Sequence, residues 1–173
     1  MSGFEALSVA SSIIQIVDFG TRVLKRLYDY QTQLGALPKA LRNVKIRLPV
    51  LIDALRNTKR AVNARRLSEE SAEALNGIVK GCEEQIRALD EILDKCSVGE
   101  EVSKVRRGWK ALESLQLDGK VEEICKVLDV YKGDLTFYWA SYDAFGGAEC
   151  KFSDSLRIFL NLHILELFLI YGN

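Results

Sequence analysis

The sequence predicts an all-α protein, an elongated antiparallel helical bundle of about five helices followed by an apolar C-terminal tail helix. Apolar residues recur at every third or fourth position through most of the chain, which is the period of an amphipathic helix. Only two of the 173 residues are proline, and long proline-free stretches rich in Leu, Ala, Glu, Lys and Arg favour helices. No segment shows the alternating pattern of a strand.

The first helix is expected from about Gly3 to Gln33 and has two apolar rows. One row consists of Phe4, Leu7, Ser11, Ile14, Val17, Thr21, Leu24 and Tyr28, and the other of Val9, Ile13, Ile16, Val23, Leu27 and Tyr30. A helix that is apolar on two sides is normally surrounded by partners, so we expect it to be buried in the resting protein. Its uncharged run, residues 6–17, is too short to span a bilayer, and no basic residue precedes it as in a signal peptide.

The second and third helices are expected over about 37–62 and 68–96. Pro38 suits the first turn of the second helix, and Pro49, inside that helix, removes one backbone hydrogen bond. Ser68 is a favourable N-cap for the third helix. The apolar row of the second helix is Leu37, Leu41, Val44, Leu48, Leu51, Leu55 and Val62, and that of the third is Leu75, Val79, Cys82, Ile86, Leu89, Leu93 and Cys96.

Two more helices are expected, over about 100–115 and 118–142, and short connections predict that successive helices run antiparallel. The segment 143–154 breaks the pattern, and a strongly apolar segment, 156–171, follows. We therefore predict a bundle domain over 1–142 and a linker with an apolar C-terminal segment over 143–173. That last segment is expected either to cover the end of the bundle as a sixth helix or to contact another chain.

The net charge is zero, but the charges are unevenly distributed. Residues 1–66 have 12 Lys/Arg and 4 Asp/Glu, a net charge of +8, whereas residues 67–173 have 12 Lys/Arg and 20 Asp/Glu, a net charge of −8. This pattern is typical of helices that attract each other across a bundle. It also fits a basic face that meets acidic lipid or an acidic partner.

Basic residues gather at both ends of the second helix, and we take them as a candidate contact face. These residues are Arg42, Lys45, Lys59, Arg60, Arg65 and Arg66. Nucleic-acid modules usually add net positive charge or stacking aromatics to such a cluster, and neither occurs here. We therefore expect no nucleic-acid partner. The remaining interpretations are that the basic residues form a solvated helix face, or that they contact an anionic membrane or an acidic protein.

The sequence has no pattern that indicates catalysis or a cofactor. It lacks the phosphate-binding loop, the dinucleotide-binding glycine pattern and the nucleophile elbow. The single histidine, His163, lies in the apolar tail, and no two of the four cysteines form a C-x-x-C pair, so we expect no metal site. Cysteines in register with apolar neighbours favour buried free thiols and a reducing, intracellular compartment. We therefore expect no enzyme, no cofactor and no small-molecule substrate.

The first 30 residues also resemble a known family of domains. The resemblance is carried by Gly3, Glu5, Ala6, Leu7, Ala10, Ser12, Ile13, Ile14, Gln15, Asp18, Gly20 and Tyr28. This pattern resembles the start of fungal N-terminal domains that precede NACHT or NB-ARC modules in STAND, or NOD-like, proteins. The chain is similar to the Ses-A/NACHT-N type, which is related to the HeLo and HeLo-like cell-death domains. The resemblance extends to about residue 140, but no nucleotide-binding motif follows in the printed sequence.

The resemblance implies a non-enzymatic helical signalling or execution domain in programmed cell death or heterokaryon incompatibility. It implies protein partners or self-association, and a cytoplasmic location with recruitment to the plasma membrane on activation. The first helix would then contact membrane or a partner through Phe4, Leu7, Val9, Ile13, Ile14, Ile16 and Val17. The alternative is a structural bundle that forms homo-oligomers through its apolar tail and has no membrane activity.

Overall fold

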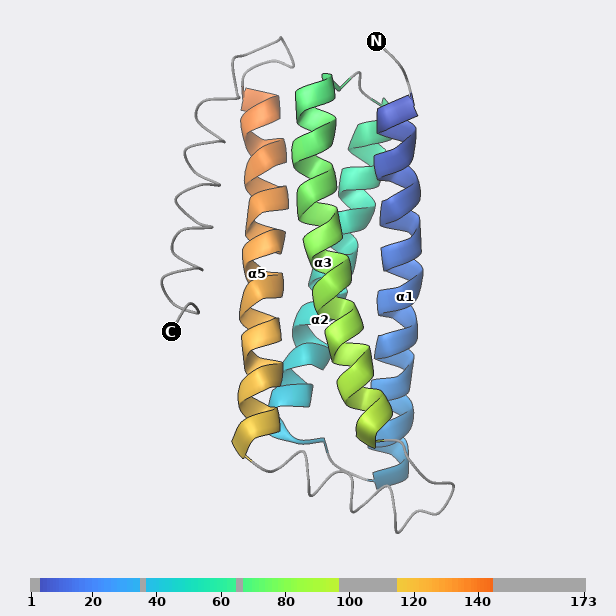
Figure 1. Cartoon of the computed structure of the whole chain (residues 1–173), viewed down its shortest axis with the longest axis vertical. Coiled ribbons are helices and arrows are strands. Elements are labelled where there is room, and N and C mark those ends of the chain that lie inside the picture. The colour runs from blue at the N-terminus through green and yellow to red at the C-terminus, as the bar shows by residue number, and fades with distance from the viewer. Residues whose placement is uncertain (1–3, 35–36, 65–66, 97–114, 145–173) are drawn as a thin grey trace. The chain divides into compact units, whose positions relative to one another are not determined.

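The computed structural model describes residues 4–34, 37–64, 67–96 and 115–144, which form four helices and no strand. Helix α1 spans Phe4–Leu34, α2 Lys39–Ala64, α3 Glu69–Cys96 and α5 Leu115–Ala144 (Figure 1). The all-helical prediction is confirmed. The short helix expected over 100–115 falls in 97–114, apart from Leu115 at the start of α5, and the tail helix expected over 156–171 falls in 145–173. Both ranges lie outside the described residues, so the count of about five helices stays a prediction.

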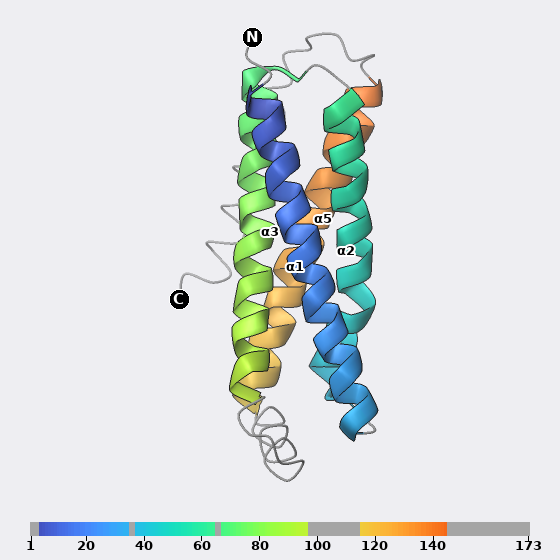
Figure 2. The same ribbon diagram turned by 90° about the vertical axis from the view of Figure 1, so that its right-hand side faces the viewer.

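The chain divides into two compact units, Met1–Trp139 and Ala140–Asn173. Within the first unit, successive helices alternate in direction, as their short connections predict (Figure 1). Helix α1 packs against both α2 and α3. Figure 2 shows α2 and α3 on opposite sides, with α1 in front and α5 behind. Alternation makes α1 and α3 run in the same direction, and the contact between them shows that they also lie side by side, which the order of the helices along the chain does not reveal.

The predicted signals lie at the starts of α2 and α3, but Pro38 stands just before the first turn of α2 and not in it. The Ser68 hydroxyl accepts a hydrogen bond from the backbone N–H of Ser71 at 3.2 Å, and the N–H of Ala72 donates to the Ser68 carbonyl at 3.0 Å. Ser68 is thus the N-cap of α3. Pro38 immediately precedes α2, and its carbonyl accepts from the N–H of Arg42 at 3.0 Å. Helix α2 continues through Pro49.

The core is formed by one apolar row from each helix. The heptad expected on α3 is buried: Leu75, Val79, Cys82, Ile86, Leu89 and Leu93. The α2 row is buried as well: Leu41, Val44, Leu48, Leu51, Leu55 and Val62. Helix α5 contributes Val121, Ile124, Cys125, Leu128, Leu135 and Tyr138. Burial of these rows removes apolar surface from water and is the main force that holds the unit together.

Polar contacts and one glycine position α5 against α2 and α3. The Arg47 guanidinium on α2 lies 2.6 Å from the Asp129 carboxylate on α5. The buried Thr58 hydroxyl donates to the Ala54 carbonyl at 2.9 Å and accepts from the Trp139 indole N–H at 3.0 Å. A Cβ atom on Gly81 would lie 2.4 Å from the ring of Tyr131, so the close approach of α3 and α5 requires glycine there.

Candidate interaction surface

The two apolar rows of α1 have different environments. The inner row is core: Val9, Ile13, Ile16, Val23 and Leu27 are all buried. The outer row faces solvent, because Leu7 is 67% exposed, Ile14 42% and Tyr28 51%. Leu7, Ile14 and Tyr28 are spaced by multiples of seven residues, close to whole pairs of turns, so they lie along one side of the helix. We call these three residues the outer stripe.

The expectation that partners within the chain would cover both rows of α1 is therefore wrong for the outer row. The seven residues predicted for membrane or partner contact are divided by the fold. Val9, Ile13 and Ile16 are in the core, Leu7 and Ile14 are exposed, and Val17 is half-buried. The side chain of Phe4 lies outside the described residues. Periodicity finds both rows but does not show which one the remaining helices cover.

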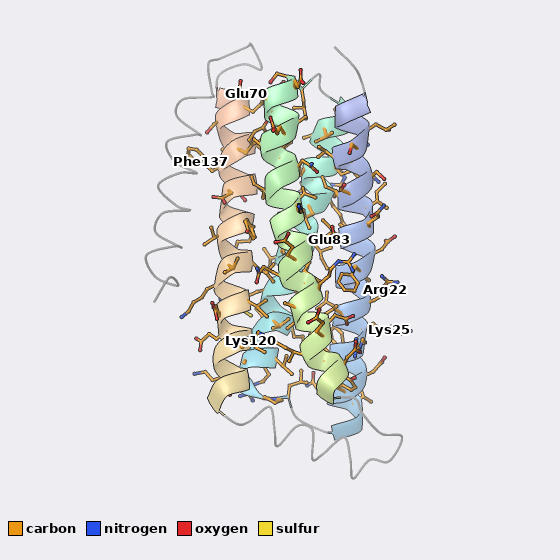
Figure 3. All side chains as sticks on the ribbon, viewed as in Figure 1. Arg22, Lys25, Glu70, Glu83, Lys120 and Phe137 are labelled. Atoms are coloured by element: carbon orange, nitrogen blue, oxygen red, sulfur yellow. The ribbon has the colours of Figure 1, made fainter. Side chains whose placement is uncertain are left out.

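The seam between α1 and α3 is closed by an aromatic ring and a group of charges. Two guanidinium groups lie over the Phe19 ring, that of Arg22 on α1 at 5.4 Å and that of Arg87 on α3 at 5.5 Å from the ring centroid. Glu83 accepts from Arg87 at 2.6 Å and holds it in place. Figure 3 labels Arg22 and Glu83 on the two sides of this seam. Cations over an aromatic face are attracted by its quadrupole.

Further along the same seam, Arg26 bridges two carboxylates of α3. Its guanidinium donates to Asp90, and to Asp94 at 2.6 Å. Burial opposes the charged form of Arg26, but hydrogen bonds with Tyr30 and Asp94 and the charge of Asp90 raise its pKa above the ordinary value. Arg26 therefore stays charged and ties the second half of α1 to α3.

Lys45 of α2 makes the polar contact with the outer stripe. Its ammonium group lies 4.0 Å from the centroid of the Tyr28 ring and donates to the Gln31 side chain. One residue predicted for the basic face thus meets one residue of the outer stripe. The two candidate regions of the sequence are brought together on adjacent helices, which spacing along the chain does not show.

The other predicted basic residues are distributed over α2. Arg42 and Arg60 are exposed, Lys59 is half-buried, and Arg65 and Arg66 lie outside the described residues. Ile46 is 69% exposed and Val50 52%. These two apolar residues lie on the same outer side of α2 as Arg42, and sequence reasoning missed them. The sequence did contain a signal for their exposure, since both are large apolar residues that lie outside the predicted core row of α2.

An open cavity of about 310 Å³ lies between the first turns of α1 and α3. It is lined by Ser8, Val9, Glu69, Ala72, Glu73 and Asn76. Its polar lining consists of two carboxylates, a hydroxyl and an amide. This lining gives no support to a catalytic reading.

The described residues include two buried thiols and no candidate metal site. Among these residues, no group of three or more His, Cys, Asp or Glu side chains could hold a metal ion. Cys82 and Cys125 are buried free thiols. Burial raises the pKa of Cys82 to about 12 and that of Cys125 to about 11, so both are protonated and unreactive at neutral pH.

Helix α1 also passes a test of length and composition for membrane spans. Its stretch Leu7–Thr32 has a mean hydropathy of 1.3 in its most apolar window, but a third of that window is buried inside the protein. Core helices of soluble proteins satisfy the same criterion. The helix is thus apolar enough to cross a bilayer, while its inner row already has partners.

Comparison with known proteins identifies one family. The family model for SesA, described as the N-terminal domain on NACHT NTPases and P-loop NTPases, matches residues 10–135. This match covers most of the chain and includes all of α2 and α3 and most of α1 and α5. Neither the curated proteins nor the solved structures contain a significant match.

Proposed function

Because the chain belongs to the SesA family of N-terminal domains of NACHT and P-loop NTPases, we propose that it is a non-enzymatic signalling domain that acts through protein contact. Family membership supports a signalling role. The observation that carries the proposal is the outer stripe of α1, in which Leu7, Ile14 and Tyr28 stay exposed although the inner row is core. Exposed apolar side chains in a row are typical of interaction sites.

Within this proposal, the domain executes programmed cell death or heterokaryon incompatibility in a fungal cytoplasm. On activation it is recruited to the plasma membrane. Two features support membrane contact: the apolar length of α1, and the basic residues of the adjacent α2, such as Arg42 and Arg60. Basic residues beside an apolar helix face favour binding to anionic lipid surfaces.

Two mechanisms differ in what happens to the inner row. In the first, the folded domain docks through the outer stripe and the inner row stays buried. In the second, α1 leaves the bundle and inserts into lipid, which exposes Val9, Ile13 and Ile16. The first mechanism leaves the core intact. The second removes apolar side chains from the core, and their burial in the bilayer must replace the free energy that the core loses.

Leakage of dye from anionic vesicles tests the membrane mechanism. We expect the protein, brought together by an added dimerising tag, to release the dye. A Leu7→Asp/Ile14→Asp variant should fold normally, since both positions are exposed, and should lose leakage. A Gln15→Asp/Thr136→Asp variant adds the same charge at exposed polar positions outside the outer stripe, one on α1 and one on α5, and should retain it.

The outcomes separate the two mechanisms. Failure of the dimerised wild-type protein to release dye would exclude membrane permeabilisation and leave docking on proteins. The signalling role itself is tested by viability of fungal cells that express the dimerised domain. If viability is unaffected by the wild-type domain, the execution role is wrong.

A further inference from the structure

The outer faces of α2 and α3 have opposite charges. Helix α2 has seven Lys/Arg and one Asp, whereas α3 has three Lys/Arg and eight Asp/Glu. The two helices lie on opposite sides of the first unit (Figure 2). Their outer faces therefore point in opposite directions and cannot meet within one chain.

Three exposed residues on each of these faces form matching patterns. On α2 they are Arg60, Asp53 and Arg42, and on α3 they are Glu73, Lys80 and Glu91. In both sets the first spacing is seven residues and the second is eleven. Seven residues are close to two helical turns and eleven close to three, so each set lies on a single side of its helix.

The signs of the two sets are complementary when the helices are antiparallel. Read from the end of α2 backwards, the charges are positive, negative and positive, whereas along α3 they are negative, positive and negative. Helix α2 and helix α3 run in opposite directions in the unit (Figure 1). A neighbouring copy that is shifted sideways without rotation therefore presents its α3 antiparallel to α2.

The register also agrees with a sideways shift. Helix α2 ends at Ala64 and α3 begins at Glu69, at the same end of the unit (Figure 1). Arg60 is four residues from the first of these boundaries, and Glu73 is four residues from the second. Both helices rise about 1.5 Å per residue. Both sets therefore begin near the same end of the unit, so a mainly sideways shift brings them toward each other.

We propose that copies of this chain associate head to tail, with the outer face of α2 of one copy against the outer face of α3 of the next. The ion pairs are Arg60 with Glu73, Asp53 with Lys80, and Arg42 with Glu91. The same register also brings Arg56 opposite Gly77, where an added Cβ atom would meet nothing within 4 Å. This surface deepens the proposed function, on which it rests, by naming a second copy as the partner.

Head-to-tail contacts of this kind do not close by symmetry. Because the two faces are different, every copy that uses its α2 face still offers a free α3 face, and the assembly extends as an open chain. Exposed ion pairs are individually weak and are screened by salt. We therefore expect association at high protein concentration and low ionic strength.

The test measures the mass of the full chain in solution, without vesicles, by light scattering and sedimentation. We expect oligomers that dissociate in high salt. An Arg42→Ala/Arg60→Ala variant and a Glu73→Ala/Glu91→Ala variant should each associate about 10-fold more weakly. A 1:1 mixture of the two should form a dimer that does not extend, because only one intact pair of faces remains. A variant with all four charges reversed should associate again.

A Glu122→Ala/Lys126→Ala variant changes two exposed charges of α5, outside both faces, and should behave as the wild type. A monomeric wild-type chain at low salt would overturn the proposal, and so would a mixture that fails to form dimers. Association that persists unchanged in both double variants would place the interface elsewhere in the chain and overturn it as well. The leakage assay tests the outer stripe of α1, whereas this assay tests the outer faces of α2 and α3 without vesicles, so the two failures can be distinguished.

Discussion

Gly81 on α3 faces the phenol ring of Tyr131 on α5, and its missing side chain leaves room for that ring. A Gly81→Ala variant must displace the ring, since its Cβ would lie 2.4 Å from a ring carbon. We expect a loss of about 1–3 kcal/mol in the free energy of unfolding, measured by urea denaturation. Gly77→Ala on the same helix meets nothing within 4 Å and should instead stabilise by about 0.5–1 kcal/mol. Equal effects at the two positions would contradict this account.

The buried thiols predict a loss of stability in alkali. The pKa of Cys82 rises from 9.0 to about 12 on folding, and that of Cys125 from 9.0 to about 11, chiefly because burial disfavours the thiolate. A thiol whose pKa is higher in the folded state contributes its full stabilisation at pH values below its unfolded pKa. This stabilisation is lost as the pH rises from the unfolded pKa through the folded pKa. Stability should thus fall above pH 9, by about 1.4 kcal/mol per pH unit for each thiol.

Urea denaturation at several pH values between about 8 and 10.5 checks the sign and the slope of this dependence. Cys82→Ala removes one titrating group, so its stability should fall less steeply with pH than that of the wild type. The comparison uses the slopes, because the substitution itself lowers the stability at every pH through the cavity it creates. Parallel slopes for the two proteins would show that the thiol does not carry the effect.

At the scale of the helices, α1 shows that two neighbouring residues of the same type can differ widely in burial. Neighbouring residues Ile13 and Ile14 are chemically identical, but Ile13 is core and Ile14 is 42% exposed. We expect Ile13→Ala to lower the free energy of unfolding by about 2–5 kcal/mol and Ile14→Ala to change it by less than about 1 kcal/mol. Thermal and urea denaturation of the two variants test this. Similar losses would mean that the outer stripe is covered in solution.

The helices themselves were predictable because each depends on local signals. The Ser68 cap, the heptad from Leu75 to Leu93 and the start of α2 after Pro38 follow from residues close together in the chain. Which row of α1 becomes core depends instead on the placement of α2 and α3. That placement is set by contacts between distant residues, such as Arg26 with Asp94, and a single sequence does not reveal them.

The same limit applies to the candidate surface. Both the apolar rows of α1 and the basic residues of α2 could be found from the sequence, because composition and period identify them. The contact of Lys45 with Tyr28 and the exposure of Ile46 and Val50 could not, because they depend on the angle at which two helices meet. The space beside Gly81 for Tyr131 was missed for the same reason, since a glycine inside a helix also fits a weakly helical position.

At the scale of the whole molecule, the charges are separated although their sum is zero. The basic α2 and the acidic α3 lie on opposite sides of the first unit (Figure 2). An anionic surface attracts one side and repels the other, so a neutral protein of this kind is oriented when it binds. The side that meets an anionic membrane would be α2, with Arg42 and Arg60, beside the outer stripe of α1.

We expect the protein to bind vesicles that contain anionic lipid more tightly than neutral vesicles, and to be released by salt. Arg42→Ala/Arg60→Ala should weaken this binding about 30-fold, because each basic residue near the surface contributes about 1 kcal/mol. Cosedimentation with vesicles measures the change. Lys120→Ala/Lys126→Ala removes the same charge from two exposed positions of α5, of which Figure 3 labels Lys120, and should have less effect. Because Arg42 and Arg60 would also form the contact with the next copy, anionic vesicles should compete with head-to-tail association and shift the free protein toward monomers. Equal losses in the two variants would mean that net charge, and not the α2 face, governs the binding.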